Sequence, residues 1–149
     1  MGRVKWIGIR PARRQTIEVL EQVQADTQNG LIGDRYAGSS GKRQVTLIQW
    51  EHLAAIASML SIEALDPALL RRNIAISGIN LLALKDKQFQ LGNAVLEYTG
   101  LCHPCSFMET TLGLGGYNAV RGHGGLTARV IDSGLIRVDD RLSFNSSVC

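Results

Sequence analysis

The sequence predicts a mixed but mostly β fold, in which short strands form a barrel-like core beside one main amphipathic helix and a few short helices. Many short stretches alternate between apolar and polar residues, which is the period of a strand. One stretch that is long enough to form a helix of several turns carries apolar residues at helical spacing. Turn-forming residues separate these stretches, and the 16 glycines exceed the average share of about 7%. Many short strands with few helices are typical of a β-barrel or a strongly bent mixed sheet.

The amino-terminal half contains candidate strands over residues 4–9, 17–24 and 43–49, each rich in β-branched or alternating apolar residues. Residues 49–60 follow directly and are predicted to form the main helix, because their apolar residues recur at helical spacing. The apolar face of this helix would consist of Trp50, Leu53, Ala54, Ile56, Ala57 and Leu60.

Pro67 is predicted to open a short helix over residues 67–72 with Asp66 as its N-cap, because proline is favoured at the first helical position. The remaining strands are expected between turn-forming pairs, in which glycine or asparagine tolerates a positive φ. These strands are residues 73–77, 89–92, 94–100, 126–134, 135–140 and 141–144, with turns at Gly92-Asn93, Ser133-Gly134 and Asp139-Asp140.

The composition is that of a globular protein. Hydrophobic residues make up 45% and charged residues 19% of the 149 residues, values outside the range of disordered or fibrous chains. The sequence shows no internal repeat or linker, so residues 1–149 are expected to form a single domain. No run approaches the roughly 18 apolar residues of a membrane span, and no signal peptide is recognisable. We therefore expect a cytoplasmic protein that does not enter a membrane.

The net charge of +3 is mild, and the basic residues are scattered, so nucleic acid is not an expected partner. Arginines far outnumber lysines, which favours small anionic ligands, although codon composition can produce the same excess. The glycines gather in clusters that either bring backbone N–H groups close to an anion or merely permit turns between strands. The clusters are Gly30 and Gly33, then Gly113, Gly115 and Gly116, then Gly122, Gly124 and Gly125, beside Arg35, Arg121 and His123.

Cys102 and Cys105 enclose a histidine and a proline in the order CHPC. A redox dithiol would need a βαβ context, in which a helix N-terminus lowers the thiol pKa. A closed zinc site would need four ligands, for which His123 and Cys149 make a poor pattern. The third alternative is one inert buried thiol and one thiol that faces a cavity.

Cys102 follows a strand and is the candidate for burial. Cys105 precedes a glycine-rich stretch with cations beyond it, which would favour a thiolate suited to a soft metal centre.

Five segments, in order, resemble the MOSC domain, the module found at the carboxyl terminus of molybdenum cofactor sulfurases and in small stand-alone proteins. The segments are NGLIGDRYAG (29–38), RQVTLIQWEHL (43–53), LRRNIAISGINL (70–81), LEYTGLCHPCSFM (96–108) and RGHGGLTARVIDSGLIRVDD (121–140). The resemblance covers about residues 4 to 144 and implies a mostly β fold with a barrel-like core.

The resemblance implies binding of the molybdenum cofactor (molybdopterin), a pterin that carries a dithiolene and a terminal phosphate. It implies that Cys105 is the catalytic residue and the metal ligand, and that Cys102 is a packing residue. Guanidinium groups suit both a phosphate and the flat edge of a pterin. The cofactor-binding residues that the family segments mark are Arg35, Arg43, Thr46, Arg72, Asn73, Arg121, His123 and Gly124.

Several neighbouring residues are interpreted from their position. Arg71 is expected to face solvent, because adjacent residues on a helix or strand point in different directions. Asp34 either orients an arginine or is simply a turn residue. His52 lies beside the apolar face of the main helix and is interpreted as an ordinary surface or edge histidine.

The function implied is that of an oxidoreductase that reduces N-hydroxylated small-molecule substrates at a molybdenum centre ligated by Cys105. Electrons would come from a separate electron-donor protein, because the chain has no flavin or nicotinamide fingerprint and too few cysteines for a ferredoxin-type cluster. The alternative is a sulfur carrier, in which Cys105 receives a persulfide from a cysteine desulfurase. A cofactor-binding module without turnover also remains open.

Overall fold

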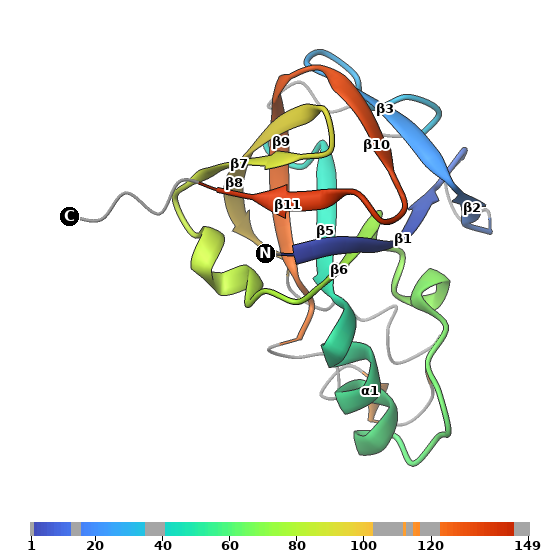
Figure 1. The fold of residues 1–149 in the computed structure, drawn as a ribbon. Coiled ribbons are helices and arrows are strands. Elements are labelled where there is room, and N and C mark those ends of the chain that lie inside the picture. Colours follow the sequence, from blue (N-terminus) through green and yellow to red (C-terminus); the bar gives the residue numbers. More distant parts are fainter. Residues whose placement is uncertain are drawn as a thin grey trace.

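The computed structural model of the chain describes residues 2–12, 16–34, 41–102, 112, 115–116 and 123–144. Within them, strands close into a barrel, which confirms the predicted fold class (Figure 1). Closure is possible because β1 pairs with β6 on one side and with β11 on the other. In the order of pairing, the barrel strands are β11 (Arg141–Ser143), β7 (Gln88–Leu91), β8 (Ala94–Leu101), β9 (Leu126–Asp132), β5 (Val45–Gln49), β6 (Ile74–Ser77) and β1 (Gly2–Ile9).

Further elements lie outside the closed barrel. β2 (Glu18–Leu20) pairs with β1, and a three-stranded sheet consists of β10 (Gly134–Arg137), β3 (Gln22–Asp26) and β4 (Gly30–Leu31). The helical segments described are α1 (Trp50–Met59) and the 3-10 turns η1 (Pro67–Leu70) and η2 (Leu81–Leu84). Among the helices of the described residues, none has the length and apolar character needed to cross a bilayer.

The connection between β5 and β6 contains α1 and η1, and these two strands pair in parallel. A parallel pair cannot be joined by a tight turn and needs a crossover of this kind. α1 begins directly where β5 ends and extends beyond the barrel (Figure 1). The crossover therefore starts at the carboxyl end of β5, where the chain leaves the wall of the barrel.

The central strands of the wall divide their side chains between two apolar clusters. Leu47 on β5 and Ile74 on β6 belong to the cluster that fills the barrel interior. Their neighbours Ile48 and Ala75 point to the outer face and pack with the buried face of α1. Successive strand residues alternate between the two faces, so both sides of β5 are covered and all of its residues are buried.

Two predicted elements differ from the structure in more than the position of their ends. The strand expected over residues 17–24 is two strands in different sheets, because the chain leaves the edge of β1 at Glu21 before β3 pairs with β10. Ala54 is exposed, so the apolar face of α1 is narrower than its sequence suggests. The buried side chains of α1 are Leu53, Ile56 and Ala57, with Trp50 and Leu60 partly buried beside them.

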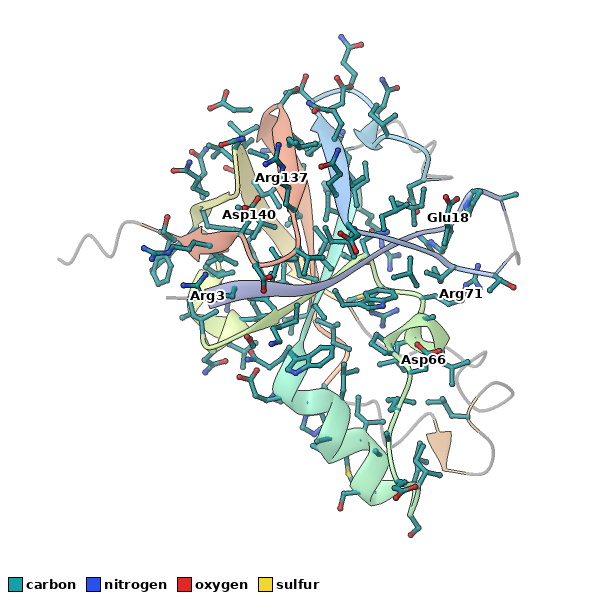
Figure 2. The ribbon with its side chains drawn as sticks, turned by 45° about the vertical axis from the view of Figure 1, so that its right-hand side comes forward. Arg3, Glu18, Asp66, Arg71, Arg137 and Asp140 are labelled. Carbon is teal, nitrogen blue, oxygen red and sulfur yellow. The ribbon has the colours of Figure 1, made fainter. Side chains whose placement is uncertain are left out.

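The short helix after Asp66 forms as predicted and ends earlier. The Asp66 carboxylate accepts a hydrogen bond from the Ala68 N–H at 3.0 Å, and Pro67 occupies the first helical position. The helix ends at Leu70 because Arg71 adopts a left-handed conformation with φ of 57° (Figure 2). This conformation turns the chain, so Arg71 remains partly exposed while the next residue enters the protein as a buried arginine.

Gly125, in the described part of the third glycine cluster, is required by its backbone conformation and by the closeness of a neighbouring strand. Its φ is +88°, and a Cβ atom there would lie only 1.8 Å from the carbonyl oxygen of Leu47. Gly124 beside it would place a Cβ atom 2.2 Å from the carbonyl oxygen of Cys102. Both glycines are therefore needed for the close approach of neighbouring backbones where the chain enters β9.

Replacement of Gly125 by alanine is expected to lower the free energy of unfolding by more than about 3 kcal/mol, because the positive φ and the backbone clash add. Chemical denaturation measures the change. Gly41→Ala is the control, because Gly41 has a similar φ of +74° but no atom within 4 Å of the added Cβ. It should cost about 1 to 2 kcal/mol. Equal losses for the two variants would contradict the proposed clash.

Candidate functional site

The site residues that the structure describes gather on the outer face of the barrel at the ends of β5, β6, β8 and β9. Thr46 is on β5, Arg72 and Asn73 immediately precede β6, and Gly124 lies just before β9. Each of these four is buried. The structure thus brings together four of the predicted cofactor-binding residues, from three separate segments of the sequence.

His123, next to Gly124, is a fifth predicted residue at this place, and the remaining predicted residues divide into two groups. Cys105, Arg35 and Arg121 lie outside the described residues, so their assigned roles stay predictions. Arg43 is described and exposed, and within the described part of the chain no hydrogen bond or ion pair joins it to the gathered residues. Cys102 is a free, buried cysteine, as predicted, with 5% of its surface exposed.

The side-chain amide of Asn73 is the centre of a buried hydrogen-bond network. Its Oδ1 accepts from the backbone N–H of Thr46 at 3.0 Å and from the Thr46 hydroxyl at 3.1 Å. Its Nδ2 donates to the carbonyl of Gly8 at 3.1 Å and to Asp34 Oδ1 at 3.3 Å. An asparagine amide has two donor hydrogens and two acceptor lone pairs, so these bonds occupy all of them. Asn73 therefore joins β5, β6 and β1 in this structure.

Asp34 extends this network to the amino-terminal strand. The side chain of Asp34 is only 1% exposed, and its Oδ1 accepts the backbone N–H of Arg10 at 2.7 Å. The Arg10 Nε lies 3.7 Å from the same oxygen. Of the two interpretations of Asp34, the contact with an arginine is present, although the arginine is Arg10. No feature of the sequence pairs these two residues, because they come from distant segments.

Arg72 connects the segment before β6 to the segment before β9. Its Nε donates to the carbonyl of Gly124 at 2.8 Å, and its Nη1 donates to the carbonyl of Leu70 at 2.9 Å. Two bonds from different nitrogens fix the plane of a guanidinium group. Cys102 completes the junction, because its backbone N–H donates to the carbonyl of Gly125 at 2.9 Å. The strand end that precedes Cys105 in the sequence is thus held beside Gly124 and Gly125.

His123 adds an imidazole to the same junction. Its Nδ1 is buried and has no hydrogen-bond partner in the described structure. Leaving a buried polar atom unpaired costs about 1 to 3 kcal/mol, so such an atom calls for an explanation such as a water, an ion or a ligand. His123 also contacts His52 of α1, with the ring centroids 4.6 Å apart and the planes at 83°. The interpretation of His52 as an ordinary surface or edge histidine did not anticipate this contact.

A shallow hollow of about 330 Å³ opens beside His52, where β6 and the start of α1 meet. Its lining residues are Gln49, Glu51, His52, Gly78, Ile79 and Asn80. Burial alone would raise the pKa of Glu51, but hydrogen bonds from the Gly78 N–H at 3.0 Å and the Gln49 Nε2 at 2.7 Å outweigh it. The pKa of Glu51 is therefore below its ordinary value, and the hollow carries a negative charge at neutral pH.

His52 is kept neutral by its surroundings. Burial lowers the pKa of His52, and the nearby His123 lowers it further, whereas Glu51 acts in the opposite direction. The net effect is a pKa below the ordinary value of 6.5, so the ring of His52 is uncharged at neutral pH.

Comparisons with known proteins agree with this architecture. The profile of the MOSC domain family matches residues 26–143. The YuaD protein of Bacillus subtilis superposes with a TM-score of 0.80 at 19% identity, covering 95% of this chain and 94% of its own. YiiM of Geobacillus stearothermophilus (TM-score 0.74, 14% identity) and YiiM of Escherichia coli (0.74, 18%) each cover 98% of this chain, and 76% and 71% of their own. At these identities the likeness shows a shared fold. Comparison with curated protein sequences finds no match.

Asn73→Ala is expected to lower the free energy of unfolding by about 2 to 4 kcal/mol, because it leaves the buried Gly8 carbonyl and Thr46 N–H without their partner. Asn73→Asp should cost at least as much, since an oxygen then faces both Gly8 and the Asp34 carboxylate. Denaturation with urea measures both. The exposed Asn93→Ala is the control and should change stability by less than about 0.5 kcal/mol. Similar losses for Asn73→Ala and Asn93→Ala would rule out the central role of the network.

The lowered pKa of His52 predicts a specific pH dependence. As pH falls below about 6.5, the unfolded chain takes up a proton at position 52 that the folded protein resists. The wild type should therefore lose stability relative to His52→Gln as pH falls from 7 to 5 in about the range where a free histidine titrates. Unfolding free energies of both proteins across this range provide the measurement. Parallel pH curves would show that His52 titrates as an unperturbed side chain.

Proposed function

The chain belongs to the MOSC domain family, and on that premise we propose that it binds the molybdenum cofactor on the outer face of the barrel, at the junction formed by Arg72, His123 and Gly124. The observation that carries this proposal is the convergence of segments: a buried arginine before β6 is bonded to the Gly124 carbonyl before β9, beside the end of β8. The cysteine-bearing segment follows β8 directly in the sequence. Residues from three of the family segments therefore meet at this junction.

The described residues fit an anionic, planar ligand. Arg72 offers a guanidinium held in a fixed plane, which suits a phosphate or the hydrogen-bonding edge of a pterin. His123 offers the buried Nδ1 described above, which is able to bond a ligand atom. Gly124 brings bare backbone against Cys102 and the Arg72 guanidinium, since a Cβ atom there would lie 2.2 Å from the Cys102 carbonyl oxygen and 3.4 Å from Nη2. A positive charge, an open polar atom and bare backbone are the features that such a ligand needs.

The role that we propose for each predicted residue is based on its contacts. Arg72 and His123 would hold the cofactor, with Arg35, Arg43 and Arg121 as further cations toward its phosphate. Thr46 and Asn73 have their hydrogen-bonding groups engaged with each other and with β1, so their proposed contribution is to hold Arg72 in place. Cys105 would give a thiolate ligand to the metal, and the cationic surroundings would favour loss of its proton.

When bound, the molybdenum centre would supply the two electrons that reduce the N–O bond of the substrate. We propose N-hydroxylated small molecules as the substrate class, and their oxygen would leave as water with the uptake of two electrons and two protons. The sequence contains no flavin or nicotinamide fingerprint, which supports a separate electron-donor protein as the source of the electrons. The hollow beside His52 and Glu51 offers a polar approach to this face of the barrel.

Protein purified from a host that makes the cofactor is expected to contain molybdenum and pterin in similar amounts. Cys105→Ala should lose most of the molybdenum, because the metal then lacks its thiolate, and Arg72→Gln should lose pterin and metal together. Cys102→Ala is the matched control and should retain both, since it removes a buried packing thiol. Metal analysis and fluorescence of the oxidised pterin are the measurements.

Two results would contradict parts of this proposal. Wild-type protein without molybdenum or pterin from such a host would exclude cofactor binding. Loaded protein that does not reduce benzamidoxime with a competent reductant would exclude the proposed reaction. If the mass of Cys105 then increased by one sulfur atom after incubation with a cysteine desulfurase, a sulfur carrier would be the function.

A further inference from the structure

His52 contacts the junction and lies in the family segment of residues 43–53, but the resemblance assigns no role to it. It lies in the first turn of α1, whereas His123 belongs to the segment that enters β9. The rings meet edge to face, with centroids 4.6 Å apart and planes at 83°. This is the favoured geometry for a pair of aromatic rings, in which the edge of one lies on the face of the other.

The contact bears on Nδ1 of His123, a buried polar atom that has no hydrogen-bond partner within the described residues. The orientation of an imidazole is usually fixed by a hydrogen bond from one of its two nitrogens. Here the ring of His52 contacts His123 directly, so packing takes over part of this role. The neighbouring Gly124 holds the backbone through its bond from Arg72. The two contacts together constrain both the backbone and the ring at this position.

The uncharged state of His52 at neutral pH agrees with a packing role. A neutral ring can lie against His123 without electrostatic repulsion, and the pKa of His52 is lowered by burial and by the proximity of His123. Glu51, the adjacent residue of α1, directs its carboxylate to the Gly78 N–H and the Gln49 amide. The carboxylate oxygens of Glu51 are therefore engaged with neighbours other than His52.

We propose that His52 is a positioning residue for the cofactor site: its ring fixes the orientation of the His123 imidazole, and with it the direction of Nδ1, beside the Arg72–Gly124 contact. The inference rests on the proposed function, because it assumes that the cofactor binds beside His123. The restraint on the His123 ring itself exists in the protein before any ligand binds. The restraint lowers the entropy that His123 would lose on contact with a planar anionic ligand.

The first test uses the protein without cofactor. The chain has 3 histidines, so the nitrogen shifts and ring relaxation of each can be assigned by NMR through single substitutions. Loss of a neighbouring ring changes proton shifts in any case, so the measured quantities are the tautomer of His123 and the order of its ring. We expect one tautomer and an ordered ring in the wild type, a disordered ring or mixed tautomers in His52→Ala, and wild-type behaviour in His52→Phe, which restores a ring. An unchanged tautomer and order in folded His52→Ala would overturn the proposal.

The second test uses protein loaded with cofactor in a producing host. His52→Ala should release pterin about three- to tenfold faster than the wild type, the range expected for loss of an aromatic pair. His52→Phe should stay within about twofold of the wild type, as should Ser58→Ala, a control at an exposed position of the same helix. Equal release from His52→Ala and the wild type would overturn the proposal. A wild type that holds no cofactor would instead refute the proposed function, and the NMR comparison alone would then decide whether His52 orients His123.

Discussion

The side-chain amide of Asn73 joins parts of the chain that lie far apart in the sequence: β5 through Thr46, β1 through Gly8, and the segment that ends at Asp34. Asn73 itself is only 1% exposed, so these bonds form away from water, where an unpaired group is costly. The backbone N–H of Asn73 also donates to the Thr46 carbonyl at 3.1 Å, so Asn73 holds β5 and β6 together at this end of their parallel pair. The position of the residue before it, Arg72, depends on this arrangement.

Arg71, Arg72 and Asn73 show how one local conformation creates the site. The left-handed conformation of Arg71 ends η1 and reverses the chain. The next residue then enters the junction as a buried guanidinium, and the one after it enters the network on the wall of the barrel. A helix that continued through this position would place Arg72 elsewhere. The buried arginine is therefore a consequence of how the short helix ends as well as of its own chemistry.

The sequence was sufficient to predict the elements whose signals are local. The N-cap at Asp66, the hairpin at Gly92 and the alternation along β5 each depend on residues within a few positions of one another. The break at Glu21 and the exposure of Ala54 depend on which strands and helix faces meet in space, which a short window of sequence does not contain. The same reason explains why the family segments marked His123 while the contact from His52 was missed.

The location of the site follows from what fills the barrel. Leu47, Ile74 and Leu126 point inward and belong to a continuous apolar cluster. Small barrels of this kind are filled by their own side chains and leave no room for a ligand of cofactor size. The outer face of β5 and β6 is covered by α1 at Ile48 and Ala75. Thr46 on β5 and Asn73 just before β6 carry polar groups at the proposed site. The proposed site therefore lies where the cover of the helix ends, and His52 is the residue of α1 that contacts His123 at this boundary.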